Sequence, residues 1–216
     1  MEKLVQRFQK LLSQTTTSFL RYNHQTIDWN DRMTAIVGAR GVGKTTLILQ
    51  HIKLHHSLKD TLYVSADDFY FSEHKLLEFA EDFHKLGGKH LFVDEIHKYN
   101  GWSKEMKLIY DYLPNLQVTF TGSSILDIFR GTDDLSRRVL LYKMYGMSFR
   151  EYLNMHYQLS LPTYTLEQVL NHEVVAEGIE FPLAAFKEYL KNGYYPFAGQ
   201  INYTERLLQT INTILE

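Results

Sequence analysis

The sequence predicts an α/β fold of three layers, with a mainly parallel five-stranded sheet between helices and a small helical extension after it. Five short apolar runs alternate with segments of helical periodicity, which is the pattern of parallel strands joined by crossover helices. The first run leads directly into a glycine-rich loop. The third ends in two adjacent acidic residues, as a buried parallel strand can at its carboxyl edge.

Composition narrows the class of protein before any motif is considered. The 216 residues suit one large domain, or one domain and the beginning of another. No apolar run approaches the roughly 20 residues that cross a bilayer, so no membrane association is expected. The chain has no cysteine, which excludes disulfides, thiolate metal sites and cysteine nucleophiles. A net charge of -2 gives no general attraction for nucleic acid.

The first 14 residues predict an amphipathic helix that packs on the domain. Apolar and charged side chains alternate at helical spacing, so the segment lacks the uncharged core of a signal peptide. Residues 15–32 are polar and irregular and lead into the first strand, Met33–Val37.

The loop after that strand, residues 38–45, matches GxxxxGK[ST], the P-loop that binds nucleotide phosphates. Glycines let successive backbone N–H groups converge on anionic oxygens, and the helix that begins near Lys44 adds its N-terminal partial charge. We expect Lys44 to reach the β- and γ-phosphates of ATP and the Thr45 hydroxyl to bind Mg²⁺. The predicted nucleotide-binding residues are Gly38, Ala39, Arg40, Gly41, Val42, Gly43, Lys44, Thr45 and Thr46.

Some of these assignments have a structural alternative. Thr46 can be an ordinary helix residue, and Arg40 can be a solvated side chain. The helix after the P-loop extends to about residue 58 and carries His51, His55 and His56. His51 and His55 share a helical face, but a zinc site needs further ligands and none is recognisable nearby. We therefore interpret these histidines as solvated.

The second strand, residues 61–66, is followed by Asp67 and Asp68. The carboxyl ends of strands in such sheets face the ligand crevice, but turn or capping roles explain these acids sufficiently. Ser72 then predicts the N-cap of a helix that ends at residue 84.

The third strand ends in Asp94 and Glu95 and is interpreted as a Walker B element, because it follows the P-loop by about fifty residues. Asp94 would hold Mg²⁺ through its water shell and complement Thr45. Glu95 would orient and polarise the attacking water as general base. A small-molecule kinase needs no such second acid, so the pair favours hydrolysis.

The fourth strand, residues 116–121, runs into Gly122, Ser123 and Ser124. A hydroxyl at this position can contact the γ-phosphate or the attacking water. Alternatively, Ser123 or Ser124 caps a short helix over residues 125–129. We include Ser123 among the catalytic candidates.

Arg137 and Arg138 precede the fifth strand, residues 139–142. An arginine aimed at the γ-phosphate would stabilise the charge that develops during transfer, in its own subunit or in a neighbouring one. As a surface residue it would have no such role. Arg138 is the first candidate and Arg137 the second.

Together, these motifs resemble those of a prokaryotic family of AAA-type ATPases, in which a C-terminal domain of unknown function usually follows the ATPase domain. The resemblance rests on the P-loop, DEIH, FTGSS and SRRVLLYKMYGMSFREYL, spans about residues 33–153, and includes a later similar segment, KEYLKNGYYPFAG. It implies ATP binding at residues 38–45, metal and water handling by Asp94 and Glu95, a sensor within residues 121–124 and an arginine near Arg138. The chain departs from the family at Arg137, where a small residue is frequent, and at residues 146–147, where Gly-Met replaces the usual Pro-Leu.

We expect residues 1–157 to form the ATPase domain and residues 158–216 a helical lid or linker, with helices near residues 166–176, 181–191 and 204–215. The last helix has no capping residue or breaker, so we expect the sequence to continue in a longer protein. The expected activity is Mg²⁺-dependent ATP hydrolysis in the cytoplasm, coupled to an unidentified protein partner and carried out by a homo-oligomer or a single chain.

Three other functions are consistent with parts of the sequence. A nucleotide-gated interaction switch with slow hydrolysis would use the same residues. A DNA-acting ATPase is disfavoured because a helicase core needs two such domains and the chain has room for one. A small-molecule kinase is the least favoured.

Overall fold

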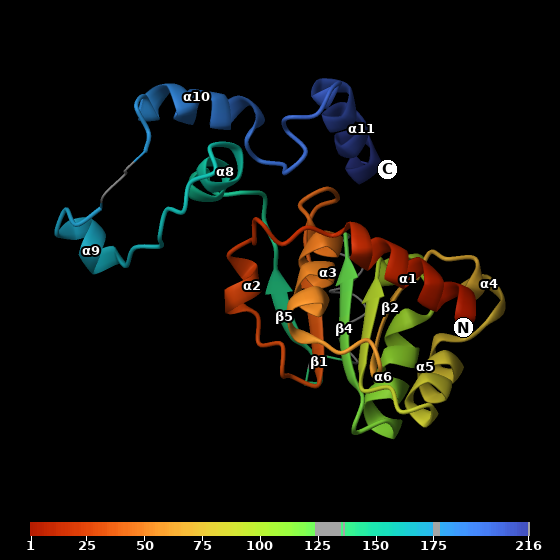
Figure 1. Ribbon diagram of the computed structural model, residues 1–216. Helices are drawn as coiled ribbons and strands as arrows, with labels where there is room; N and C mark the ends of the chain where they lie inside the picture. The colour runs from red at the N-terminus through yellow and green to blue at the C-terminus, as the bar shows by residue number, and fades with distance from the viewer. Residues whose placement is uncertain (124–134, 136, 175–177, 216) are drawn as a thin grey trace.

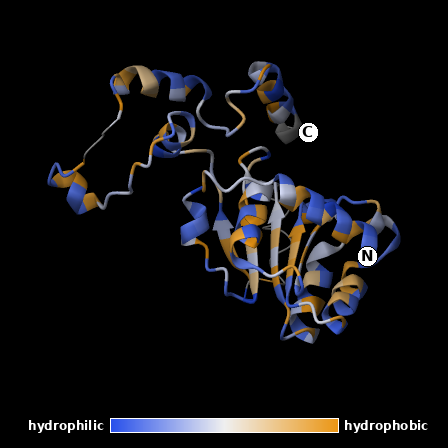
Figure 2. Cartoon of the chain, viewed as in Figure 1, coloured by the Kyte–Doolittle hydropathy of each residue, from blue (hydrophilic) through white to orange (hydrophobic). Residues whose placement is uncertain are grey.

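The computed structural model describes residues 1–123, 135, 137–174 and 178–215 (Figure 1). Its centre is one sheet of five parallel strands in the order β2-β3-β4-β1-β5. The strands are β1 (Met33–Val37), β2 (Thr61–Ser65), β3 (His90–Asp94), β4 (Gln117–Gly122) and β5 (Leu140–Lys143). The predicted α/β class and five-stranded parallel sheet are confirmed. Figure 2 shows apolar residues within the sheet.

The order of the strands places helices on both faces of the sheet. The step from β1 to β2 crosses the sheet in one direction and the steps from β2 to β3 and β4 return in the other. Because such crossovers are right-handed, α3 (Lys44–His55) lies on one face, and α5 (Leu76–Lys85) and α6 (Trp102–Tyr112) lie on the opposite face. α1 (Glu2–Gln14) joins the face of α3 and buries Leu4, Phe8 and Leu12. The result is the predicted arrangement of three layers.

The helix expected to start after Ser72 is wrong, because the chain forms two helices there. These are α4 (Tyr70–Glu73) and α5, and they are separated by extended backbone at His74. Ser72 lies within α4 and donates its hydroxyl to the Phe69 carbonyl, so it caps nothing. The break lets Phe71 and Phe79 pack edge to face in the core, with ring centroids 5.3 Å apart. Asp68 has the expected turn role, accepting a hydrogen bond from the Tyr70 amide at 3.0 Å.

The helices after the sheet form a second, smaller cluster. α8 (Phe149–His156) packs with α10 (Pro182–Asn192) around Met147, Tyr152, Leu153 and Ala185. α9 (Leu166–Leu170) is shorter than expected and buries no residue, while residues 175–177 lie outside the described part. α11 (Tyr203–Leu215) returns to the main core, where Tyr203 and Leu207 pack. The boundary between residues 157 and 158 stays a prediction.

The short helix expected over residues 125–129, with Ser124, lies outside the described residues. No helix in the described part of the chain is both long and apolar enough to span a membrane.

Candidate nucleotide-binding site

The P-loop joins β1 to α3 at the carboxyl edge of the sheet. Gly41 and Gly43 have φ values of +85° and +101°, a region that favours glycine, and Gly43 is the N-cap of α3. At Gly38 the constraint is a close approach instead, because a Cβ would lie 2.1 Å from the Met144 carbonyl oxygen. Backbone geometry thus requires all three glycines that the motif supplies.

The Lys44 side chain is buried within the loop. Its ammonium group donates to the carbonyl oxygens of Gly38, at 2.8 Å, and Ala39, at 3.1 Å. Burial lowers the pKa of Lys44, and the nearby negative charges of Glu95 and Asp94 oppose that shift only in part. The two acids therefore lie within electrostatic reach of the lysine, as the sequence predicts for one phosphate site.

Asp94, at the end of β3, collects hydroxyl groups from three neighbouring elements. Its Oδ2 accepts hydrogen bonds from the Thr45 hydroxyl at 2.6 Å and the Tyr63 hydroxyl at 2.7 Å, and its Oδ1 accepts one from Thr121. Carboxylate and hydroxyl oxygens are ligands that Mg²⁺ accepts, so Thr45 and Asp94 fit this ion.

Sequence reasoning missed Tyr63, which lies mid-strand in β2 and looks like an ordinary core aromatic. Burial raises the pKa of its hydroxyl, and the adjacent Asp94 charge raises it further. Tyr63 therefore remains a hydrogen-bond donor to Asp94 at physiological pH.

Glu95 has a backbone conformation that few non-glycine residues adopt, with φ +53° and ψ +41°. Its amide donates to the Thr121 hydroxyl at 3.0 Å, and its Oε2 lies 3.4 Å from both Ser123 Oγ and His97 Nε2. Ser123 Oγ and His97 Nε2 are 3.0 Å apart. The structure thus brings together the predicted Glu95 and Ser123, and adds His97, which the sequence shows only as the last letter of DEIH.

Arg21, in the segment before β1, connects the P-loop to α8. Its guanidinium donates to the Val42 carbonyl at 2.7 Å, to the Tyr145 and Gly146 carbonyls at 2.8 and 3.0 Å, and to Glu151 of α8 at 2.8 Å. Both charged side chains are almost fully buried. Sequence reasoning missed this pair because its members are far apart in the chain.

Residues 195–197, which follow α10, lie against the P-loop. The Phe197 ring lies 2.8 Å from the position that a Cβ on Gly41 would occupy, and Pro196 lies 3.8 Å from the position of a Cβ on Gly43. A groove of about 600 Å³ opens beside Phe197 and is lined by Arg40 of the loop and Arg206 of α11. That volume falls in the range of small-molecule sites, and two guanidinium groups suit an anion. Arg206 is a further residue that sequence reasoning missed.

A close packing contact explains the unusual Gly146. A Cβ there would lie 2.5 Å from atoms of the Tyr194 ring, and the Met147 amide donates to the Tyr194 carbonyl at 2.8 Å. The ring of Tyr194 therefore occupies the space of a side chain at position 146.

The remaining predicted residues lie away from this centre. Thr46 is exposed on the first turn of α3. Arg138 forms a two-pronged ion pair with Asp111 at 2.9 and 3.2 Å, just before β5 begins, and so lies at the edge of the sheet opposite the P-loop. Arg137 is exposed beside it.

Comparison with known proteins identifies the family. A family model described as an AAA domain matches residues 30–153, more than half of the chain. The uncharacterized protein MJ1637 of Methanocaldococcus jannaschii is 31% identical over 209 residues, covering 87% of this chain and 43% of that protein. This chain therefore spans less than half the length of that relative.

Solved structures with similar folds include C. elegans PCH-2, with a TM-score of 0.47 and 16% identity over 98% of this chain and 66% of that one. A katanin self-assembly structure has a TM-score of 0.45 and 16% identity, covering 73% of this chain and 52% of that one. DnaA from Aquifex aeolicus bound to AMPPCP has a TM-score of 0.43 and 17% identity, with coverages of 94% and 65%. The AAA-domain match includes the P-loop, Asp94 and Glu95, and the chain belongs to the AAA domain family.

Proposed function

We propose that this protein binds ATP and ADP through residues 38–46 and hydrolyses ATP in a reaction that depends on Mg²⁺. The observation that carries the proposal is the 2.6 Å contact between the Thr45 hydroxyl and Asp94, with Glu95 as the next residue. This contact supports a metal-binding role for Thr45 and Asp94, with the candidate base Glu95 directly after Asp94 in the chain.

Each residue has a role that its position supports. Lys44 would exchange its two carbonyl partners for β- and γ-phosphate oxygens, and Thr45 and Asp94 would hold Mg²⁺. When bound, Mg²⁺ neutralises charge on the phosphates. Glu95 would accept a proton from the attacking water, and Ser123 would position the Glu95 carboxylate or the water. His97 would orient the same pair.

Arg138 would act on a neighbouring subunit and not on its own. It precedes β5 at the opposite edge of the sheet from the P-loop, so the nucleotide of its own chain is out of reach. Assembly with other copies of the chain would bring an arginine of one copy to the phosphates of the next, where it would stabilise transferred charge.

A nucleotide-gated switch is the second candidate function. Arg21 connects the P-loop to α8, and residues 195–197 of the helical extension lie against the loop, so occupancy of the loop would alter contacts of α8 and of that extension. In this function residues 158–216 act as a lid that presents a surface to a protein partner in the cytoplasm, and hydrolysis resets it slowly.

The described structure gives little support to a DNA-acting ATPase. The segment 130–150 is basic, with Arg130, Arg137, Arg138, Lys143 and Arg150. Two of its arginines have partners within the chain: Arg138 pairs with Asp111, and Arg150 donates to the Leu161 carbonyl at 3.4 Å. We therefore do not assign a nucleic-acid surface to this segment.

The experiment compares phosphate release with Mg²⁺-ATP in the native chain, Glu95→Gln and Lys44→Ala, and measures nucleotide binding by calorimetry. We expect Glu95→Gln to bind ATP normally and to lose turnover by about 10²- to 10⁴-fold, because it removes a general base. Lys44→Ala should lose nucleotide affinity. Glu78→Gln, a change at an exposed site on α5, is the matched control and should behave as native.

The outcomes separate the two candidate functions. Normal turnover by Glu95→Gln would exclude Glu95 as the base. Tight binding without turnover in the native chain would favour the switch. Failure of the native chain to bind ATP would contradict both.

A further inference from the structure

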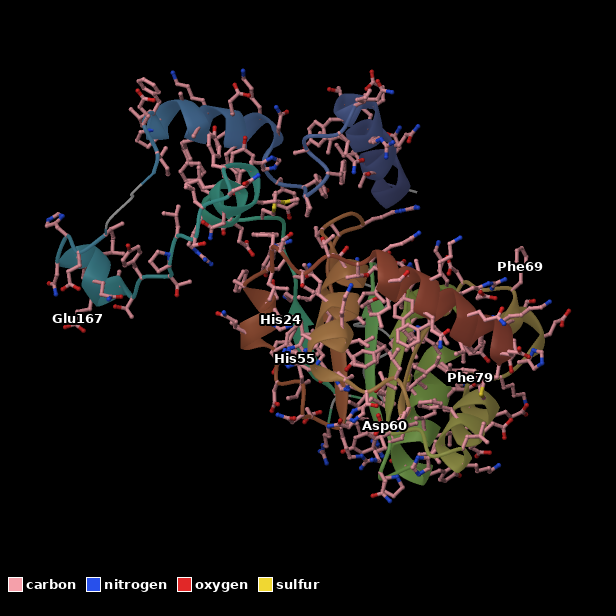
Figure 3. The ribbon with its side chains drawn as sticks, in the orientation of Figure 1. His24, His55, Asp60, Phe69, Phe79 and Glu167 are labelled. Carbon is pink, nitrogen blue, oxygen red and sulfur yellow. The ribbon has the colours of Figure 1, made fainter. Side chains whose placement is uncertain are left out.

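Three histidines from two separate elements meet on one side of the sheet domain. His24 comes from α2 (Asn23–Thr26), and His51 and His55 come from the last turns of α3. One ring nitrogen of each lies within 4.8 Å of a ring nitrogen of the other two. Figure 3 labels His24 and His55, which lie next to each other where α2 meets α3.

The interpretation of these histidines as solvated is wrong for His51, which is only 5% exposed. Its ring stacks on Trp29 with a centroid distance of 3.8 Å. The third histidine of the cluster, His24, lies in the segment before β1 that the sequence predicts to be irregular. Nothing in the spacing connects that segment with the end of α3.

Two of the ring nitrogens in this cluster are buried and have no hydrogen-bond partner: Nε2 of His24 and Nδ1 of His51. A buried polar atom without a partner costs free energy, so natural proteins rarely leave two together. Metal coordination satisfies a ring nitrogen as a hydrogen bond does.

His56 is a hydrogen-bond partner of His51, and this contact indicates which ring nitrogen of His51 can bind a metal ion. Its Nε2 lies 3.1 Å from His56 Nε2, and His56 Nδ1 lies 3.5 Å from the Thr61 hydroxyl. With Nε2–H of His51 as donor to His56, the lone pair of His51 is on Nδ1. Metal-binding histidines usually have such a hydrogen bond on the other nitrogen, which fixes the ring orientation.

We propose that His24, His51 and His55 bind a divalent transition-metal ion such as Zn²⁺, as a structural clamp between α2 and α3. Three imidazoles leave the fourth tetrahedral position for water. Zn–N bonds of about 2.1 Å place tetrahedral ligand nitrogens roughly 3.4 Å apart, so the rings must draw together slightly. His55 is exposed and free to adjust.

The surroundings favour a cation at this position. The cluster lies at the C-terminal end of α3, where the helix dipole is negative. A groove of about 570 Å³ beside the cluster provides access for the ion.

This site is separate from the nucleotide site. Lys44 and His55 are the first and last residues of α3, about 16 Å apart at the usual rise per residue. The clamp would hold the segment that also contains Arg21, and so would steady the P-loop indirectly.

The test uses the untagged chain, stripped of metal and titrated with Zn²⁺ against a chromogenic indicator, with stoichiometry from native mass spectrometry. We expect one Zn²⁺ per chain. His24→Asn and His55→Asn should each weaken binding by more than the roughly 10- to 100-fold that loss of an outer partner causes. His172→Asn, at an exposed histidine where asparagine tolerates the positive φ, is the matched control and should bind as native.

Two further measurements test the coordination of the ion and the location of its site. Co²⁺ should give the absorption of a four- or five-coordinate site in the native chain and lose it in His55→Asn, a change at an exposed side chain that should leave the fold intact. Zn²⁺ binding should survive excess Mg²⁺ and the Lys44→Ala change, which places it outside the P-loop. Equal Zn²⁺ affinity in native and His55→Asn chains, or no stoichiometric binding by the native chain, would overturn the proposal.

Discussion

Arg21 and Glu151 form a buried ion pair whose strength depends on several hydrogen bonds at once. Burial alone would raise the pKa of Glu151, but the hydrogen bond and charge of Arg21, with the amides of Ser148 and Tyr22, outweigh it and lower the pKa below 4.5. The carboxylate is thus ionised in the native state wherever its unfolded counterpart is.

Glu151→Gln should destabilise the protein by about 3 kcal/mol at pH 7, because it leaves the Arg21 charge buried without a partner. The folded pKa of Glu151 is depressed, so its contribution is complete above the unfolded pKa and disappears as the pH falls through the folded pKa. The difference in unfolding free energy between native and variant should therefore shrink below about pH 4.5. Urea unfolding at several pH values measures it.

The matched control for this prediction is Glu188→Gln, because Glu188 pairs with Lys191 on an exposed helix surface at 3.5 Å. Its effect should stay within about 0.5 kcal/mol at every pH. Equal effects of the two substitutions would mean that Arg21 and Glu151 do not form a strong pair in solution.

Among individual residues, the sequence predicts those whose roles follow from their position next to a strand end. Lys44, Thr45, Asp94 and Glu95 are recognisable because each stands at a fixed place beside a strand end. Tyr63 and Arg21 were missed, since a side chain that reaches a site from mid-strand or from an irregular segment has no local pattern. Contacts between distant residues are set by the fold as a whole.

Among the elements, α3 and the segment 195–197 have the most direct connection with function. α3 begins at the P-loop and ends at the histidine cluster. Residues 195–197 belong to the helical extension and pack against the P-loop. Tyr195 and Phe197 stack with centroids 5.1 Å apart, which gives the segment a rigid contact face.

Phe197→Ala should speed the release of bound nucleotide by about tenfold, because burial of an aromatic ring contributes about 1.5–3 kcal/mol and part of that holds the segment on the loop. Stopped-flow fluorescence with a labelled ADP measures the rate. Phe186→Ala removes an aromatic ring of α10 that packs against Phe149 of α8, and serves as the matched control. An unchanged release rate for Phe197→Ala would show that the segment does not cover the nucleotide.

Strands were easier to predict than helices. All five strands were expected close to their observed positions, because each apolar run ends in turn or loop residues. The helix placed after Ser72 failed because a serine before an apolar segment predicts a cap equally well whether one helix or two follow. Packing of Phe71 against Phe79 decided between them, and such packing is not visible in the pattern.

In the folded chain, Arg138 lies far from the nucleotide site of the same chain. We therefore expect ATP turnover to depend on association with other copies of the chain. We expect phosphate release per chain to rise with protein concentration and to fall by about 10³-fold in Arg138→Ala. A mixture of Arg138→Ala with Lys44→Ala should recover part of the activity, because one chain supplies the arginine and the other the intact P-loop. Light scattering and phosphate release on the same samples measure both quantities.

Asp111→Ala is the control, since it removes the partner of Arg138 and leaves the arginine in place. If Arg138 serves only its ion pair, both substitutions will lower stability alike and leave turnover unchanged. Activity that does not vary with concentration and is not restored by mixing would contradict a role in a neighbouring subunit.

The contact between Gly146 and Tyr194 limits how this chain can vary. Residue 146 lies between the sheet domain and α8, and Tyr194 follows α10, so the two positions are distant in sequence but share one volume. A relative with a larger side chain at position 146 must either carry a smaller one at position 194 or turn that ring aside. We therefore expect the residues at these two positions to change together, and a chimera that exchanges the extension between relatives should carry both.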